Sequence, residues 1–381
     1  MSSVASPSYD LAVIGGGIAG VTAAANLATD LSLVLLEQET ELAYHTTSRS
    51  AAMYFESDDA GPFGSLVAAS RPFFDAEHPE LDAPLLKPMP VLILGEAERR
   101  TEFERVARSA RTRSPHINVE IVEGTAIREW CPVLSGVAEL GRIETTSAEI
   151  DVMGLHQLYV RRTVAAGGTI TRAAGVGSIG RGRHRRWRLE TAAGPVEADL
   201  IVNAAGAWAD QVAVQAGVEP VGLSPLRRTA FTVRTAHDSR AWPFIFSEIT
   251  DLTCYFKPEA GNQLLCSPAD ETPVEPGDAR AEEIDVATAI DRLNTLTTLD
   301  IRSVVRTWAG QRTFSPDRCP VWGFDDEVEG FFWFAGQGGW GIGTAPAAGL
   351  LARGLILDDS VPASLHQRGV EAETLSPARF R

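Results

Sequence analysis

The alternation of apolar and polar positions predicts a strand, a helix and a second strand at the start of the chain. Residues 11–14 form a short apolar run of the kind found in buried parallel strands, and residues 18–28 form an apolar, alanine-rich helix. A second apolar run, Leu33–Leu36, ends on the acidic residue Glu37. This order predicts a βαβ unit.

The pattern in the rest of the chain predicts further helices and strands and, between residues 218 and 305, a second sheet. Helical patterns occur at 63–74, 97–109, 126–130, 155–166, 281–296 and 344–355, and strand patterns at 91–94, 117–122, 169–171, 176–179, 187–191, 200–203 and 331–335. Between 218 and 305, turns separate short apolar runs at 229–233, 244–246, 255–257 and 263–267, which predicts the antiparallel strands of a second sheet. The polar tail after Pro362 is expected to be only loosely ordered.

Three glycines after the first strand have the spacing of a dinucleotide-binding motif. Gly15 permits a tight turn, Gly17 lets backbone amides approach a diphosphate, and Gly20 lets the helix pack closely on the strand. Glu37 follows about twenty positions later, where an acid would accept hydrogen bonds from a ribose. Because a strand precedes the glycines and a helix follows them, the motif indicates a dinucleotide site, without distinguishing NAD from FAD.

Three later segments are candidates for the same site. Residues 41–56 are rich in small and hydroxyl side chains that could contact a cofactor, although Ser48 or Ser50 could instead cap a short helix at 51–54. Residues 204–206 are small and follow a buried strand. Residues 336–343 form the densest glycine loop of the chain, and the strand and helix that frame it favour ligand binding over a flexible linker.

Composition and charge narrow the range of partners. The 381 residues suffice for two domains, and a net charge of −16 argues against nucleic acid or an anionic membrane as a general partner. Arg181, Arg183, Arg185 and Arg186 gather at one hairpin, where a solvated turn is favoured over a nucleic-acid contact.

Targeting and metal-binding signals are also missing from the sequence. No apolar run approaches the roughly 20 residues that span a bilayer, and the first residues lack the features of a signal peptide. The scattered cysteines, Cys131, Cys254, Cys266 and Cys319, favour a reduced, cytoplasmic protein without a metal site.

Several motifs together resemble the D-amino-acid oxidase superfamily of FAD enzymes. VIGGGIAG, IVNAAGAWAD and AGQGGWGIGTAPAAG are similar to its three FAD segments. YHTTSRSAA, DVMGLHQLY, LRRTAFTV, YFKPEAG and TWAGQRTF are most similar to the bacterial catabolic D-amino-acid dehydrogenases of the D-arginine type, and the resemblance covers nearly the whole chain. It implies an α/β fold (α+β overall) with a Rossmann-like FAD-binding domain at 1–79, 146–215 and 320–381, and an antiparallel-sheet substrate domain at 80–145 and 216–319.

The resemblance also implies the residues of the site. Arg228 and Arg312 would pair with the substrate carboxylate, Tyr255 would add a hydroxyl, and the Gly339 carbonyl would accept from the amine, with Met53 and Val91 near the substrate side chain. FAD would be contacted by Gly15, Gly17, Ile18, Ala19, Gly20, Glu37, Gln38, His45, Thr46, Ser48, Arg49, Ser50, Ala51, Ala52, Val176, Ala204, Ala205, Gly206, Trp208, Gly310, Arg312, Gly336, Gly338, Gly339, Trp340, Gly341 and Ile342.

The implied reaction is oxidative deamination of a D-amino acid. The Cα hydride passes to flavin N5, the imino acid hydrolyses to a 2-oxo acid and ammonia, and oxygen or a quinone or dye reoxidises the flavin. No catalytic base is assigned, and His45 is interpreted as a structural or cofactor residue. FAD is expected to be non-covalent, because Gly310 and Gln311 occupy the region where some sarcosine oxidases carry the attaching cysteine.

The departures from the resemblance concern the substrate side chain. In arginine-preferring relatives a carboxylate stands at the position of Val91, and Met53 and Phe55 replace a histidine and a threonine. A cationic tail without that partner would lose roughly 3–5 kcal/mol, so we expect apolar D-amino acids to be preferred over D-arginine, although Asp58 and Asp59 near the pocket mouth could restore some affinity for a cation.

Two alternative functions stay open from the sequence. An N-methyl amino acid, a cyclic amino acid or a 2-hydroxy acid would present the same carboxylate to the two arginines. A non-catalytic flavin-binding protein would carry the same cofactor motifs. The sequence does not predict the oligomeric state.

Overall fold

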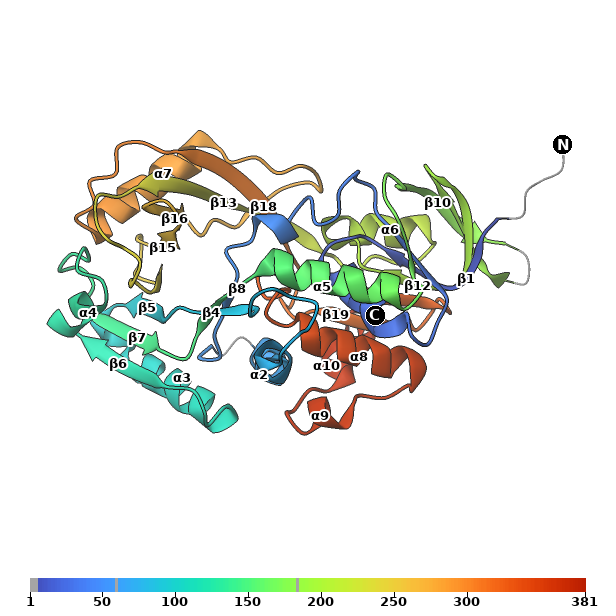
Figure 1. Cartoon of the computed structure of the whole chain (residues 1–381), viewed down its shortest axis with the longest axis horizontal. Coiled ribbons are helices and arrows are strands. Elements are labelled where there is room, and N and C mark those ends of the chain that lie inside the picture. Colours follow the sequence, from blue (N-terminus) through green and yellow to red (C-terminus); the bar gives the residue numbers. More distant parts are fainter. Residues whose placement is uncertain (1–5, 59–60, 183–184) are drawn as a thin grey trace.

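A computed structural model describes residues 6–58, 61–182 and 185–381, and two large sheets organise it (Figure 1). At the centre of the first sheet, parallel strands run in the order β20 (Phe331–Ala335), β12 (Gly194–Asn203), β1 (Ser8–Ile14), β2 (Leu33–Leu36) and β9 (Thr169–Thr171). The antiparallel strands β10 (Val176–Arg181), β11 (Trp187–Thr191) and β19 (Val321–Phe324) complete it. The predicted βαβ unit is therefore the middle of this sheet.

Both faces of the first sheet are covered, which explains why its central strands are apolar throughout. Along β1, Leu11 and Val13 enter one core and Ala12 and Ile14 enter another. Helices α1 (Ile18–Leu27), α5 (Val152–Ala165) and α8 (Ala345–Leu357) pack on the first face, and α6 (Ala209–Gln215) packs on the second.

The second sheet is built from segments that are far apart in the chain. Its order is β17 (Thr272–Pro273), β13 (Ser224–Arg234), β16 (Gln263–Ser267), β15 (Cys254–Glu259), β14 (Phe244–Ser247), β5 (Val91–Gly95), β7 (Leu140–Glu144) and β6 (Val119–Glu123), with β18 (Arg306–Phe314) also beside β13. Helices α3 (Arg100–Arg113), α4 (Thr125–Trp130) and α7 (Glu283–Leu296) accompany it. A small sheet of β3 (Met53–Tyr54), β8 (Ala148–Ile150) and β4 (Leu86–Pro88) and helix α2 (Pro62–Asp75) complete the central region.

The second sheet departs from the expected antiparallel arrangement at one place. Among the described strands, β14 and β5 pair in parallel, with Phe244 opposite Val91, whereas the other pairs are antiparallel. The chain between these two strands passes through the first sheet, so no hairpin forces them to run in opposite directions.

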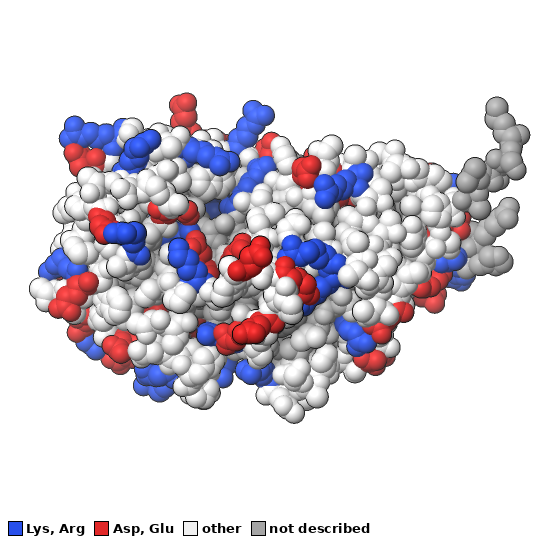
Figure 2. Space-filling model, in the orientation of Figure 1, with Lys and Arg blue, Asp and Glu red and all other residues white. Residues whose placement is uncertain are grey.

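The distribution of strands supports the division into two domains that we propose. The first sheet takes its strands from 1–79, 146–215 and 320–381, and the second takes its strands from 80–145 and 216–319. On the face shown in Figure 2, acidic and basic groups are interspersed. In the described part of the chain, no helix combines the length and hydropathy needed to cross a membrane.

The basic hairpin binds its own chain at two of its arginines. The Arg181 guanidinium lies 3.5 Å from the ring centroid of Trp187. Arg186 donates to the backbone carbonyl of Tyr9 and pairs with Asp199 at 2.7 Å. Arg183 lies outside the described residues.

Two local predictions were wrong. Instead of a helix at 51–54, a 3₁₀ turn covers Thr47–Arg49 and the short strand β3 follows it. The tail after Pro362 is folded, with helices α9 (Ala363–His366) and α10 (Ala372–Leu375) and a 3₁₀ turn at Pro377–Phe380. Leu365, Val370 and Leu375 enter the first core, because three apolar side chains are sufficient to dock a polar segment when they reach a common surface.

Replacing Leu375 tests whether the tail is part of the core. Leu375→Ala removes a fully buried side chain and should lower the free energy of unfolding by about 2–5 kcal/mol in urea denaturation. Leu350→Ala is the matched control, because Leu350 is 44% exposed and its loss should change stability by less than about 0.5 kcal/mol. Equal effects of the two substitutions would contradict a docked tail.

Candidate active site

A single cavity collects most of the predicted cofactor residues. It lies at the carboxyl ends of β1, β2 and β12, and its far wall is formed by the second sheet. Its lining includes Gly15, Gly17, Ile18, Ala19, Glu37, Gln38, His45, Thr46, Arg49, Ser50, Ala51, Val176, Ala204, Ala205, Gly206, Trp208, Gly310, Gly338, Gly339, Gly341 and Ile342, together with the predicted substrate residues Arg228, Tyr255 and Arg312.

Seven predicted site residues do not line this cavity. Gly20 and Gly336 shape the backbone, because a Cβ would lie 1.8 Å from the Gly15 carbonyl oxygen and 3.3 Å from the Val321 nitrogen, respectively. The others lie beside the cavity: Ser48, Ala52, Met53, Val91 and Trp340.

The glycine loop leaves the space that a bound diphosphate needs. Gly15 has φ +110°, and a Cβ there would lie 2.5 Å from the carbonyl oxygen of Ala204. At Gly17, a Cβ would lie 3.3 Å from the Thr47 hydroxyl. The backbone of this loop and the start of α1 therefore face the cavity without side chains in between, which fits a dinucleotide at the positive end of the helix.

Two side chains hold the loop in place by accepting hydrogen bonds from its backbone N–H groups. Glu37 is buried; one of its carboxylate oxygens accepts from the Gly16 N–H at 2.7 Å and the other accepts from the Glu39 N–H at 2.8 Å. The Thr47 hydroxyl accepts from the Ile18 N–H at 3.0 Å and so satisfies the first turn of α1. Each Glu37 oxygen keeps a lone pair for a ribose hydroxyl, as its predicted role requires.

The segment from His45 to Arg49 is held between the two sheets. The Thr46 hydroxyl donates to the Gln311 carbonyl at 2.6 Å, and Arg49 donates to the Ala309 carbonyl at 2.8 Å. His45 Nε2 lies 3.0 Å from Glu39, its ring lies 4.7 Å from the Trp208 ring, and its Nδ1 has no hydrogen-bond partner among the described residues. These contacts agree with a structural or cofactor role for His45.

Two arginines on the second sheet face the cavity with different degrees of pairing. Arg228 lies opposite Gly310 across β13 and β18, and Arg312 is two residues further along the same face. Arg228 donates to the Asp270 carbonyl at 2.8 Å and pairs with Glu271 at 3.3 Å. Arg312 has no hydrogen bond or ion pair within the described ranges. Among the described residues, the Arg312 guanidinium therefore has no acidic partner within ion-pair distance.

The surroundings of Arg312 keep its guanidinium charged and accessible to an anion. Burial, followed by the positive charge of Arg228, lowers the pKa of Arg312 to about 10, so the group remains charged at neutral pH. Tyr255 is buried beside it, and its hydroxyl makes no hydrogen bond with a described residue. A Cβ at Gly339 would lie 3.0 Å from Arg312 Nη1, so the missing side chain keeps the guanidinium accessible. A carboxylate is the group that this arrangement would bind best.

Apolar side chains lie next to this carboxylate site. Met53, Phe55 and Phe246 are half-buried and pack on the cluster that contains Val91 and Tyr255. The Phe55 ring is 5.3 Å from the ring of Trp340 in the glycine-rich loop. Val91 itself is fully buried in the cluster, so it supports the apolar wall from behind.

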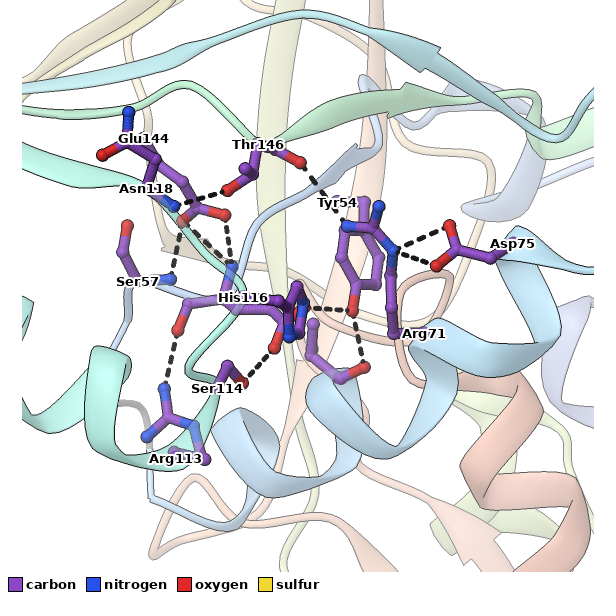
Figure 3. A network of polar contacts seen from close by, with 12 residues as sticks. Tyr54, Ser57, Arg71, Asp75, Arg113, Ser114, His116, Asn118, Glu144 and Thr146 are labelled. Carbon is purple, nitrogen blue, oxygen red and sulfur yellow. Dashed lines mark hydrogen bonds and ion pairs between the residues drawn. The ribbon is translucent and has the colours of Figure 1, made fainter.

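The carboxylate opposite Val91 in the sheet already has hydrogen-bond partners. Glu144 lies opposite Val91 and is buried, but it accepts the backbone N–H groups of Glu56, at 3.1 and 3.2 Å, and of Ser57, at 2.8 Å (Figure 3). Burial raises the pKa of Glu144. It does not line the cavity, and so it does not replace the missing acid as a partner for a cationic tail.

A second buried carboxylate fastens the segment that carries Phe55. Glu56 accepts from the Tyr54 hydroxyl at 2.9 Å and from the Ser114 hydroxyl, and it lies 3.0 Å from His116 Nε2. Figure 3 shows Tyr54 on β3 close to Ser114 and His116, which lie in the turn that follows α3. The network holds the backbone on both sides of Phe55, so the apolar wall is a fixed feature. Asp58 is half-buried at the end of this segment, and Asp59 lies outside the described residues.

Sequence reasoning did not assign several residues that the structure brings to the site. Thr47 lies inside the hydroxyl-rich segment that the sequence suggested for cofactor contacts, and the structure adds its contact with α1. Gln337 lies in the glycine loop 336–343, and Gln211 and Gln215 lie on α6, just after the IVNAAGAWAD motif. The motifs pointed to these segments, but only the packing of the elements shows which of their side chains reach the cavity.

The described residues contain no arrangement for a metal ion, and the cysteines lie away from the cavity. No group of three or more His, Cys, Asp or Glu side chains in the described ranges could hold a metal. Cys131, Cys254 and Cys266 are buried, and Cys319 is half-buried outside the cavity lining. No cysteine thiol is therefore among the described residues that line the cavity.

Changing Glu37 tests its role at the loop. In Glu37→Gln, an amide NH₂ would face a backbone N–H, so we expect the dissociation constant for FAD to rise at least about tenfold, measured by the fluorescence of released flavin. Glu41→Gln is the matched control, because the Glu41 side chain is 71% exposed and should leave the constant unchanged. An unchanged constant in both variants would contradict the role of Glu37.

Comparisons with known proteins identify the family of this chain. Residues 10–355 match the model of the DAO family, described as FAD dependent oxidoreductase. The hydrogen cyanide synthase subunit HcnC of Pseudomonas protegens is 26% identical over 178 residues, which cover 45% of this chain and 39% of that protein. Glycine oxidase of Geobacillus kaustophilus is 25% identical over 363 residues, 91% of this chain and 93% of the enzyme.

Solved structures share the fold along the whole chain. The crystal structure of glycine oxidase from Geobacillus kaustophilus has a TM-score of 0.79 at 22% identity and covers 94% of this chain and 96% of its own. L-proline dehydrogenase from P. horikoshii has a TM-score of 0.80 at 18% identity and covers 99% and 98%. The chain belongs to the DAO family of FAD-dependent oxidoreductases.

Proposed function

We propose that the chain catalyses the oxidative deamination of D-amino acids with apolar side chains to 2-oxo acids and ammonia. The observation that carries this proposal is the Arg312 guanidinium, which has no ion-pair partner among the described residues and faces the cavity beside Tyr255 and Gly339. When bound, FAD supplies the acceptor for the hydride that leaves the substrate Cα.

The chain's own residues bind and orient the substrate. Arg312 would bind the carboxylate in a bidentate manner, and the Tyr255 hydroxyl would donate to the same group. The Gly339 carbonyl would accept from the amine, which holds the Cα in a fixed position. Arg228 would contribute less charge than Arg312, because Glu271 and the Asp270 carbonyl already engage it.

The preference for apolar side chains rests on the wall beside Tyr255. Met53, Phe55, Phe246 and Trp340 lie beside the cavity, outside its lining, and would offer apolar surface to a side chain that extends past Tyr255. Glu144, opposite Val91 in the sheet, already accepts hydrogen bonds from backbone N–H groups. A cationic tail at this wall would lose its hydration without gaining a partner. The D configuration rests on the sequence motifs shared with D-amino-acid dehydrogenases.

A second candidate substrate class is favoured by one relative. The similarity to glycine oxidase extends over 91% of this chain, so a small, N-methylated or cyclic amino acid is the alternative. Such a substrate would use the same carboxylate site and leave the apolar wall unfilled.

Anaerobic flavin reduction across a substrate panel tests the proposal. D-leucine, D-methionine and D-phenylalanine should bleach the flavin band near about 450 nm at least roughly tenfold more efficiently than D-arginine or D-lysine. Faster reduction by glycine, sarcosine or proline would favour the alternative. D-arginine as the best substrate would contradict the apolar preference, and no reduction by any compound would contradict enzymatic activity on amino acids.

Replacing Arg312 tests the carboxylate site. Arg312→Met should lower kcat/KM by roughly 100-fold or more, and Arg312→Lys should recover only part of the loss, since an ammonium cannot form the bidentate contact. Arg302→Met is the matched control, because the Arg302 side chain is 81% exposed and pairs only with the nearby Asp300 in the described structure. A kcat/KM that is unchanged in Arg312→Met would exclude this residue as the clamp.

A further inference from the structure

One buried histidine lies directly beneath the glycine loop and has no role in the site as described so far. His156 on α5 is fully buried, and its Nε2 lies 3.0 Å from the backbone carbonyl oxygen of Gly16, 140 residues earlier in the chain. Its Nδ1 has no hydrogen-bond partner among the described residues. A carbonyl oxygen only accepts, so Nε2 must carry the proton and the imidazole is in the Nε2–H form.

This contact acts on the peptide that carries the Gly17 amide. The Gly16 carbonyl and the Gly17 N–H belong to one peptide group, which is trans, so they point in opposite directions. The carbonyl accepts from His156 and also from the Ala43 N–H, at 3.1 Å. With the carbonyl held on this side, the N–H is directed to the other side. Gly17 lines the cavity and begins α1, where a diphosphate would bind.

The neighbouring peptide of the loop is also fixed by a side chain. Glu37 accepts the Gly16 N–H at 2.7 Å. Glycine backbones are conformationally free, so a loop of three consecutive glycines, Gly15 to Gly17, needs such contacts to hold one geometry. His156 and Glu37 hold Gly16 by its carbonyl and its amide, from elements that are distant in sequence.

The protonation state of His156 is consistent with a hydrogen bond that does not change near neutral pH. Burial lowers the pKa of His156; the hydrogen bond to the Gly16 carbonyl opposes this shift, and the charge of Arg172 adds to it. The ring is therefore neutral near neutral pH, and it adds no charge that would vary beneath the cofactor.

We propose that His156 is a positioning residue for FAD, because its Nε2–H bond to Gly16 orients the Gly17 amide toward the diphosphate. The proposal concerns cofactor binding and does not depend on which amino acid is the substrate. A residue that served only to fill space would act through its volume, whereas His156 acts through one donor atom.

Three variants distinguish the effect of the hydrogen-bond donor from the effect of side-chain volume. His156→Met keeps an apolar side chain of similar length but removes the donor, and His156→Gln keeps an N–H donor. Tyr159→Phe is the matched control, since Tyr159 is buried on the same helix and its hydroxyl has no partner in the described structure. The purified holoenzymes are diluted, and the released FAD is measured by its fluorescence to give a dissociation constant, while Tm is recorded with saturating FAD.

The expected result is a rise in the FAD dissociation constant of about tenfold or more in His156→Met, with His156→Gln within about threefold of the wild type and Tyr159→Phe unchanged. Equal constants in His156→Met and the wild type would overturn the proposal, even if Tm fell. Equal weakening in His156→Met and His156→Gln would also overturn it, because the donor would then not matter.

A measurement on the wild-type protein keeps the proposal testable if His156→Met does not fold. Long-range proton–nitrogen NMR of the holoenzyme reports which imidazole nitrogen carries the proton, and the signal of His156 is assigned by its absence from the His156→Gln spectrum. The Nε2–H form should be observed at pH 7. The Nδ1–H form at this residue would overturn the proposal.

Discussion

The close approach of three backbone segments at the glycine loop is the constraint on which the rest of the structure depends. Gly15 packs against the carbonyl of Ala204, and Gly20 packs against the carbonyl of Gly15, with no space for a Cβ at either glycine. These contacts join β1, α1 and the end of β12 in one place. The cavity for FAD exists because the strand ends and the helix start meet there without side chains between them.

The second sheet contributes a positive charge to the cavity, the Arg312 guanidinium, which has no acidic partner among the described residues. Arg227, next to Arg228 on β13, pairs with Asp285 at 2.8 Å and with Glu282, and Arg228 pairs with Glu271. Arg312 alone among these arginines lacks such a partner in the described structure. A desolvated guanidinium is costly unless an anion binds it, so this imbalance favours a substrate carboxylate at that point.

The sequence determined the first sheet and its cofactor site to a large extent. The βαβ unit, the glycine spacing and Glu37 are local patterns, and each of these elements needs only neighbouring residues to be recognised. Expectations about short or polar segments failed where burial by distant residues decided the outcome. The tail after Pro362 reads as polar, yet Leu375 is fully buried, and Met53–Tyr54 form a strand because β8 pairs with them.

Only the tertiary structure decided which side chains share a space. The spacing of Arg228 and Arg312 along the chain does not reveal that they lie on one face, or that acidic neighbours engage only one of them. His156 and Gly16 are 140 residues apart, and Glu144, which does not line the cavity, accepts hydrogen bonds from the backbone of Glu56 and Ser57. A motif records the local backbone conformation, whereas pairing and desolvation of charges depend on contacts between distant segments, and these are set by packing.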